Sequence, residues 1–331
     1  MLNDSLTIAD LGEHQLLQRL HQFCPAAVVG DDGAVLAVAA GMRLVVTTDV
    51  LVEGVHFSDP TTPPAAVGWR SLAANLSDLA AMGATPIGFT IGLSLPPTTR
   101  LDWIEALYTG MKRCGDEYDA PMVGGDVTRS PTPTIAITAF GQVTPDRVIS
   151  RRGAQVGDRL LVTGYHGNAR AGLELLLNPD AIRLAMSDRA LLIHAHQYPR
   201  PRLDCLPILA NYPRIIGMDS SDGLADAVLQ LCALAGLGAR LNTLPIDPML
   251  RNAVGDDRAR DWALYGGEDF ELVLILPPDD AIALLDSLGP PAQIIGTIIA
   301  DPTVQLCDRA PFLTLNPAQR FQHFTPTAAE H

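Results

Sequence analysis

Aspartate recurs in five short segments of the sequence, each placed where an apolar stretch gives way to a turn. The segments are Gly30-Asp31-Asp32-Gly33, Thr47-Thr48-Asp49, Asn75-Leu76-Ser77-Asp78, Gly124-Gly125-Asp126 and Asp219-Ser220-Ser221-Asp222-Gly223. Carboxylates and hydroxyls without an accompanying cysteine or histidine cluster are the ligands that Mg²⁺ prefers. A single Asp-Gly pair is typical of an ordinary turn, but converging carboxylates repel one another and need cations between them. The segments therefore predict either a magnesium site or aspartates dispersed over the surface.

The sequence lacks the usual lysine-based devices for binding phosphate. Lys112 is the only lysine and Arg113 follows it, so no GxxxxGK[ST] loop is present, and neither an HRD nor a DFG motif occurs. Any phosphate must therefore be bound by metal ions, backbone N–H groups and arginine.

The composition narrows the class of partner. The chain has 37 acidic and 23 basic residues and a formal net charge of −14, with no basic run, which disfavours nucleic acid and anionic membranes. The first ten residues do not resemble a signal peptide, and no apolar run reaches membrane-spanning length, so we expect a cytoplasmic protein. The five cysteines are scattered without a CxxC pair, so they predict reduced, buried thiols.

The elements that must position these residues follow an α/β pattern. At 331 residues the chain is long enough for two domains, and a polar, glycine-containing stretch at residues 144–158 predicts the connection between them. We expect domains at residues 1–145 and 146–331. Apolar spacing predicts strands at residues 35–38, 44–46, 87–95, 135–143, 160–163, 215–218 and 272–276. Helices are expected at residues 16–23, 62–82, 101–118, 171–177, 224–235 and 281–288.

Seven motifs give the sequence a resemblance to a known family. GDDGAV, TTDVLVEGVHF, LAANLSDLAAMGA, GGDVTRS, SRRGAQVGD, MDSSDGL and ALYGGEDFEL occur in the order and spacing of thiamine-monophosphate kinase, over about residues 28–324. The resemblance implies the two-domain α/β fold (α+β) of the superfamily that includes aminoimidazole ribonucleotide synthetase. It also implies that the N-terminal domain binds ATP and Mg²⁺ and pairs with a second copy into a dimeric β-barrel, while the C-terminal domain completes the ATP and substrate sites.

The resemblance also assigns roles to individual residues. It implies magnesium ligands at Asp32, Thr47, Thr48, Asp49, Asp78, Asp126, Asp219 and Asp222. Gly125, Asp126, Arg151 and Ser221 would contact ATP, and His56, Glu268 and Phe321 would hold thiamine monophosphate. Asp78, Asp126, Arg151 and Asp219 are the expected catalytic residues. The implied reaction phosphorylates thiamine monophosphate to thiamine diphosphate with ATP and several Mg²⁺ ions, in a homodimer.

Some features depart from the family pattern, and other interpretations stay open. Asn168 and Ala169 stand where relatives usually carry Asp-Ser, so that loop is given no catalytic role, and Ser220 replaces an aliphatic residue. Tyr108 lies in a region where relatives contact ATP, without a secure alignment. The alternatives are an ATP-dependent enzyme like aminoimidazole ribonucleotide synthetase or selenophosphate synthetase, or an inactive module that binds magnesium or nucleotide.

Overall fold

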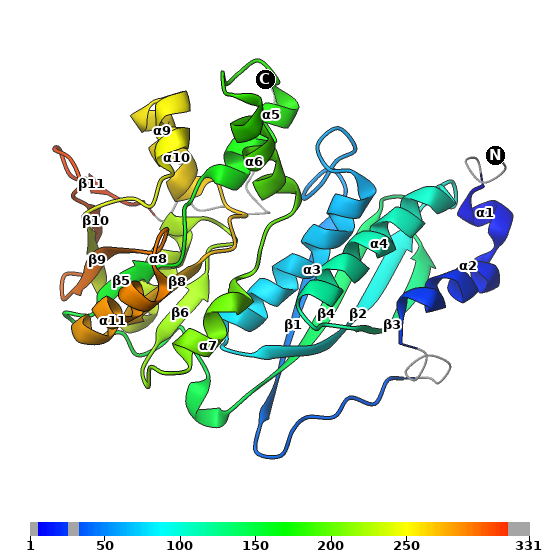
Figure 1. Ribbon diagram of the computed structural model, residues 1–331, viewed down its shortest axis with the longest axis horizontal. Coiled ribbons are helices and arrows are strands. Elements are labelled where there is room, and N and C mark those ends of the chain that lie inside the picture. Colours follow the sequence, from blue (N-terminus) through cyan, green and yellow to red (C-terminus); the bar gives the residue numbers. More distant parts are fainter. Residues whose placement is uncertain (1–5, 26–32, 317–331) are drawn as a thin grey trace, which may run out of the picture. The chain divides into compact units, whose positions relative to one another are not determined.

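The computed structural model describes residues 6–25 and 33–316, which form two compact units (Figure 1). Unit 1 comprises residues 1–150 and 171–215, and unit 2 comprises residues 151–170 and 216–331. The predicted division at residue 145 lies close to the first of these breaks, but residues 171–215 pack with unit 1. No helix in the described part of the chain is long and apolar enough to cross a membrane.

Unit 1 is built on a four-stranded mixed sheet in the order β1-β4-β2-β3. Its strands are β1 (Arg43–Val52), β2 (Thr85–Leu95), β3 (Met122–Arg129) and β4 (Thr134–Val143). Strand β4 pairs antiparallel with both β1 and β2, and β3 pairs parallel with β2. In the described residues the sheet is open, with β1 and β3 at its edges.

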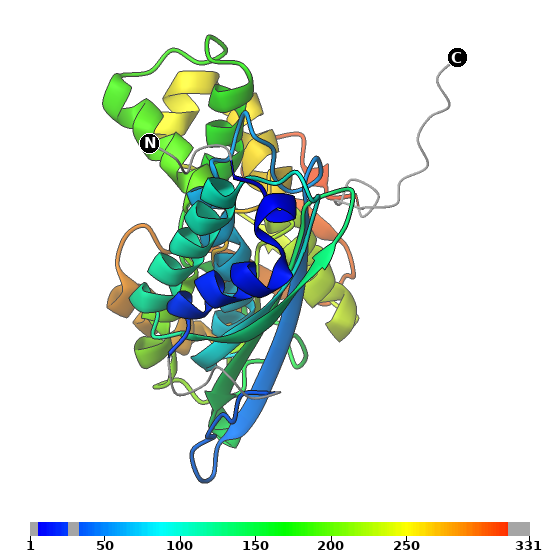
Figure 2. The same ribbon diagram turned by 90° about the vertical axis from the view of Figure 1, so that its right-hand side faces the viewer.

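Helices cover one face of this sheet (Figure 2). The helices of this unit are α1 (Ile8–Leu11), α2 (Glu13–Leu20), η1 (His21–Phe23), α3 (Pro64–Ala81), α4 (Leu101–Glu117), η2 (Pro145–Arg147), α6 (Met186–Gln197), η3 (Arg202–Cys205) and α7 (Leu206–Leu209). Proline at the first position of α3 agrees with the predicted start, because proline fits the first turn of a helix. Helix α3 is buried along most of its length, since it contacts the sheet, α4 and α6.

Two glycines let α3 and α4 approach closely. A Cβ at Gly68 would lie 1.9 Å from the carbonyl oxygen of Leu107, and one at Gly110 would lie 1.8 Å from that of Ala65. Real Cβ atoms do not come so close to backbone oxygen, so the crossing requires glycine at both positions. The large buried side chains between the helices and the sheet, among them Leu72, Phe89 and Ile104, form the core of this unit.

Unit 2 contains a seven-stranded mixed sheet in the order β11-β10-β7-β9-β5-β8-β6. The strands are β5 (Arg159–Val162), β6 (Ile216–Asp219), β7 (Gly238–Leu241), β8 (Leu272–Leu276), β9 (Gln293–Ile299), β10 (Val304–Leu306) and β11 (Leu313–Thr314). The helices are α8 (Leu224–Ala235), α9 (Pro248–Val254), α10 (Asp256–Tyr265) and α11 (Pro278–Leu288), and α5 (Asn168–Leu177) begins in this unit. Strand β8, between β5 and β6, is wholly buried, which explains its continuous run of apolar residues.

The predicted elements are confirmed except for one strand, and several observed elements were not predicted. The predicted strand at residues 35–38 is wrong, because this segment has no partner strand and stays irregular, with Val35 94% exposed. The sequence did not predict strand β3, which carries the Gly124-Gly125-Asp126 segment. It also did not predict α6, α9, α10, β7, β9, β10 and β11. All five cysteines have free thiols, and Cys114, Cys205 and Cys232 are buried as expected, whereas Cys24 and Cys307 are only partly buried.

Candidate active site

In unit 1 the structure brings β1 and the C-terminal half of α3 together through polar contacts. The Thr47 hydroxyl donates a hydrogen bond to Oδ2 of Asp78. Two residues along β1, the backbone N–H of Asp49 donates to Oδ1 of Asn75, at 3.1 Å. Asn75 is fully buried, and its own amide donates to the carbonyl of Ser71 within α3. Three of the predicted magnesium ligands, Thr47, Asp49 and Asp78, thus share one face of the sheet.

Other predicted ligands of unit 1 occupy the opposite face. Thr48 alternates with Thr47 along β1, and its hydroxyl lies 2.8 Å from that of Thr138 on β4. Asp126 pairs in register with Gly92, an exposed position of β2 on that same face. In a single chain, therefore, Thr48 and Asp126 do not join the other three.

Glycine at position 125 is a geometric requirement of β3. A Cβ there would lie 2.4 Å from the carbonyl oxygen of Ile91 and 2.7 Å from its Cγ2. Strand β3 could not pair with β2 at its present distance if residue 125 carried a side chain. The backbone beside Asp126 is consequently open and exposed.

His56 lies in a tight turn that follows β1. The backbone N–H of Val52 donates to Nδ1 of His56, at 3.1 Å. Because Nδ1 accepts this bond, the neutral ring carries its proton on Nε2, so the far side of the imidazole is a hydrogen-bond donor. The guanidinium of the buried Arg70 donates to the His56 carbonyl at 3.5 Å, which ties the turn to α3.

In unit 2 two loops bring Asp219, Ser221 and Glu268 together. Asp219 ends β6 and is 2% exposed, and the Ser221 hydroxyl donates to its Oδ1 at 3.5 Å. The backbone N–H of Glu268 donates to the carbonyl of Ser221 at 2.7 Å. Asp222 follows on the exposed side of the same loop.

Arg151 lies along α8 of the same unit. Its guanidinium donates to Oε1 of Gln230 at 3.1 Å, and the Gln230 amide donates to Asp226. The Arg151 side chain is exposed, so its charge is available to a phosphate group at low desolvation cost.

A buried polar network lies behind the Asp219 loop. His166 is fully buried, with Nε2 placed 2.9 Å from the Ser220 hydroxyl and Nδ1 placed 3.2 Å from the carbonyl of Gly164. A carbonyl can only accept, so Nδ1 carries the proton toward Gly164. The Ser220 hydroxyl lies between Nε2 and the carbonyl of Glu271, to which it donates at 3.1 Å. Burial lowers the pKa of His166 to about 4, against the opposing effect of the Gly164 carbonyl.

This lowered pKa predicts a pH dependence of stability. Between about pH 6.5 and pH 4 the unfolded chain binds a proton at His166 that the folded protein does not bind. The contribution is therefore complete above pH 6.5 and is lost as pH falls, by roughly 2 kcal/mol between pH 7 and pH 5. Urea unfolding of the wild type and of His166→Asn at both pH values should show a smaller difference in the variant. An equal pH dependence in the two proteins would contradict the assignment.

Asp269 has a shifted pKa of the opposite sign. Burial of its carboxylate raises the pKa to about 7, with smaller contributions from Glu271 and Glu268, while hydrogen bonds from the amides of Ala169 and Gly167 oppose the shift. Titration of Asp269 therefore lowers the free energy of unfolding as pH rises toward 7, whereas titration of His166 raises it. Because the two effects oppose each other in the wild type, the His166 effect must be measured by comparison with the His166→Asn variant.

Several expected residues are not placed together by the structure. Asp32 and Phe321 lie outside the described residues. Among the described residues, no group of three or more histidine, cysteine, aspartate or glutamate side chains is arranged to hold a metal ion. Tyr108 is 3% exposed and packs against Phe23 in the core, so its hydroxyl does not face solvent in this structure.

Comparison with known proteins identifies the family. A curated thiamine-monophosphate kinase of Synechococcus elongatus is 53% identical over 327 residues, covering 96% of this chain and 98% of that protein. The chain belongs to the thiamine-monophosphate kinase family. Two protein-family models also match the chain. The one described as AIR synthase related protein, N-terminal domain, matches residues 30–143, and the one described as AIR synthase related protein, C-terminal domain, matches residues 155–308. The resemblance seen in the sequence is thereby confirmed.

Two solved structures agree with this assignment. Thiamine-monophosphate kinase from Stenotrophomonas maltophilia is 36% identical with a TM-score of 0.79, covering 91% of this chain and 98% of that one. A structure described as AaThiL complexed with AMPPCP and TMP is 30% identical with a TM-score of 0.74, covering 96% and 99%. The two-domain α/β fold of the AIR synthase type is thus confirmed for this member of the thiamine-monophosphate kinase family.

Proposed function

We propose that the protein transfers the γ-phosphoryl group of ATP to the phosphate of thiamine monophosphate, giving thiamine diphosphate and ADP. The observation that carries the proposal is the 53% identity to a thiamine-monophosphate kinase over nearly the whole of both chains. The similarity to a structure described as bound to AMPPCP and TMP supports an ATP analogue and thiamine monophosphate as the occupants of the site.

The chemistry fits the side chains that the chain provides. The nucleophile is a phosphate oxygen, already largely ionised at neutral pH because its second pKa is about 6. No general base is needed, and the enzyme must instead hold two polyanions in line. A site with many aspartates and few histidines suits this task.

We assign the magnesium ligands to Asp32, Thr47, Thr48, Asp49, Asp78, Asp126, Asp219 and Asp222. The donors are carboxylates and hydroxyls alone, which suit Mg²⁺, and the contact between Thr47 and Asp78 places two of them side by side. When bound, Mg²⁺ neutralises phosphate charge and aligns the transferred group. The carboxylates of Asp78, Asp126 and Asp219 keep the ions in place, and the exposed guanidinium of Arg151 stabilises charge on the transferred phosphoryl group.

The remaining assignments follow from the same proposal. Gly125, Asp126, Arg151 and Ser221 contact ATP, and the exposed backbone at Gly125 is accessible for this. His56, Glu268 and Phe321 hold thiamine monophosphate. The Nε2 donor of His56 suits an acceptor atom, and the Glu268 carboxylate suits the cationic thiazolium or the aminopyrimidine.

We further propose a homodimer formed through the sheet of unit 1, closing a composite barrel. The sheet face away from α3 and α4 presents Leu44, Val46 and Val50, which are 51%, 53% and 48% exposed. An apolar sheet face of this kind is a typical interaction surface.

A coupled assay for ADP release tests the reaction. We expect turnover with thiamine monophosphate, none without an acceptor, and at least about 100-fold less with free thiamine, whose hydroxyl would need a general base. Mg²⁺ or Mn²⁺ should support the reaction, exhaustive chelation should abolish it, and Zn²⁺ should substitute poorly. Comparable turnover of free thiamine, or full activity after chelation, would overturn the proposal.

A further inference from the structure

The turn that carries Glu268 has an unfavourable backbone conformation. Gly267, Glu268 and Phe270 have φ angles of 66°, 61° and 51°. Among the described residues other than glycine, only Asp119 also has a positive φ. A positive φ costs a residue other than glycine about 1 kcal/mol, so the conformations of Glu268 and Phe270 persist only where their surroundings hold them. The direction of the Glu268 side chain therefore depends on whatever fixes this turn.

Asp269, between the two strained residues, makes the contacts that fix it. Its Oδ2 accepts a hydrogen bond from the backbone N–H of Gly167 at 2.7 Å, and its Oδ1 accepts one from Ala169 at 2.9 Å. The two bonds use both carboxylate oxygens and fasten the turn to the N-terminus of α5, where Gly167 precedes the helix and Ala169 lies in its first turn.

The turn is also pressed against the loop that carries Asp219 and Ser221. A Cβ at Gly267 would lie 2.8 Å from the carbonyl oxygen of Ser221, and one at Gly223 would lie 2.8 Å from that of Leu264. The bond from the Glu268 N–H to the Ser221 carbonyl spans the same contact. A shift of the turn would therefore displace Glu268 first.

We propose that Asp269 is a positioning residue for the reaction, which sets the direction of the Glu268 carboxylate by holding the amides of Gly167 and Ala169. The proposal rests on the role of Glu268 in binding thiamine monophosphate. It also gives a function to the loop at Asn168 and Ala169, whose side chains depart from the family pattern. The loop acts through its backbone, so those side chains can vary.

The test is Asp269→Asn, which keeps the volume but replaces one acceptor oxygen by an NH₂ donor that faces an amide donor. We expect KM for thiamine monophosphate to rise at least about tenfold, with KM for ATP and kcat changed less than about threefold. Glu268→Gln should raise the same KM. In the Glu268→Gln background, Asp269→Asn should have little further effect, because both changes remove one interaction.

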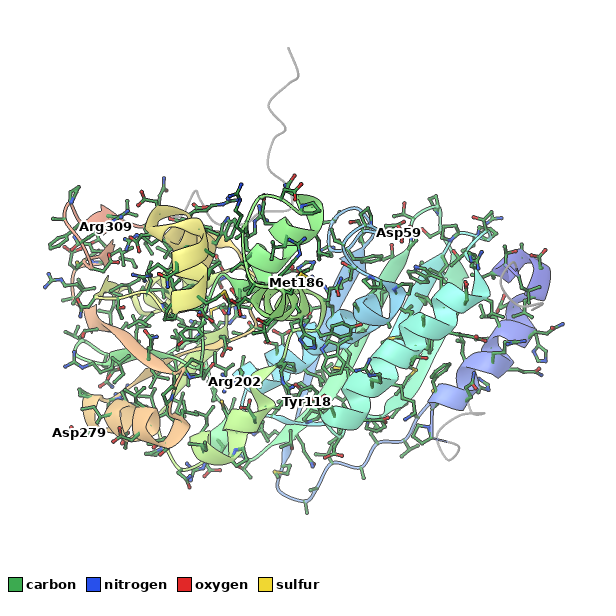
Figure 3. All side chains as sticks on the ribbon, turned by 45° about the horizontal axis from the view of Figure 1, so that its top comes forward. Asp59, Tyr118, Met186, Arg202, Asp279 and Arg309 are labelled. Atoms are coloured by element: carbon green, nitrogen blue, oxygen red, sulfur yellow. The ribbon has the colours of Figure 1, made fainter. Side chains whose placement is uncertain are left out.

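Two control variants separate positioning from general damage to unit 2. Asp308→Asn breaks the buried ion pair with Arg260 of α10 and should lower stability without changing KM for thiamine monophosphate. Asp279→Asn removes an exposed carboxylate on α11 (Figure 3) and should change neither. If Asp308→Asn raises that KM as much as Asp269→Asn does, Asp269 has only a structural role.

Hydrogen–deuterium exchange provides a measurement that does not depend on activity. The amides of Gly167, Ala169 and Glu268 should lose protection in Asp269→Asn and keep it in Asp279→Asn. Unchanged protection, or fully additive effects in the double variant, would overturn the positioning role. A wild type without thiamine monophosphate turnover would overturn the proposed function instead, and the exchange result would still decide whether Asp269 holds the turn.

Discussion

Replacing Asp78 by asparagine is expected to reduce turnover about 100-fold while leaving the protein folded. Losing one charged metal clamp should raise the barrier by roughly 3 kcal/mol. The fold should survive because the asparagine carbonyl can still accept the hydrogen bond from Thr47 that Asp78 accepts now. A change of about 1 kcal/mol or less in the free energy of unfolding is expected.

Initial rates and thermal melting with and without Mg²⁺-ATP test this. The melting temperature of ligand-free Asp78→Asn should hold or rise, since one of several repelling carboxylates is removed, and the stabilisation by Mg²⁺-ATP should shrink. The matched control is Asp116→Asn, which removes an exposed carboxylate on α4 that pairs with Lys112. This variant should behave like the wild type. Near-normal turnover with an undiminished magnesium-dependent shift in Asp78→Asn would show that Asp78 is not a metal ligand.

Replacing Gly110 by alanine should destabilise unit 1 by about 3 kcal/mol or more. The added methyl would lie 1.8 Å from the carbonyl oxygen of Ala65, which is backbone, so no rotamer change can relieve the contact. Helices α3 and α4 would have to separate, and the gain of about 1 kcal/mol in helix propensity is too small to compensate.

Denaturant unfolding of Gly110→Ala measures this cost. Thr109→Ala is the control, because Thr109 is the exposed neighbour on α4 and its hydroxyl bonds only within the helix, to the carbonyl of Glu105. The control should change the free energy of unfolding by less than about 0.5 kcal/mol. A loss of stability in Gly110→Ala no larger than that would mean that the helices can adjust, and that the crossing does not require glycine.

The sequence predicted well the elements whose pattern is local. Helix α8 and strand β8 have the predicted bounds. Helix α8 has apolar residues at helical spacing and ends at Gly236, and β8 is a continuous apolar run that ends at Pro277. Strand β3 could not be found in this way, because Gly124-Gly125-Asp126 has low strand propensity and forms a strand only by pairing with β2. Residues 35–38 have high strand propensity, but they pair with no strand in the described part of the chain and stay irregular.

The candidate site was predictable in its chemistry but not in its geometry. The aspartate segments were visible in the sequence, whereas the separation of Thr47 from Thr48 and Asp126 depends on strand register. Asn75, His166 and Asp269 act through contacts with distant segments, such as the bonds from Gly167 and Ala169 to Asp269. Nothing in a single sequence marks such pairings. The assignment of substrate and ions therefore stays a prediction that the assays above decide.

The interrupted course of unit 1 along the chain limits how the protein can be made and dissected. Two buried side chains of α3 depend on residues beyond the interruption, since the indole N–H of Trp69 donates to the carbonyl of Pro199 and the Arg70 guanidinium donates to that of His196. A fragment ending at residue 150 would leave both donors unsatisfied in an apolar interior, which is costly. On the ribosome, this unit can close only after residue 215 has emerged. The nascent chain must therefore hold residues 151–170 as an open loop until the rest of their own unit is synthesised.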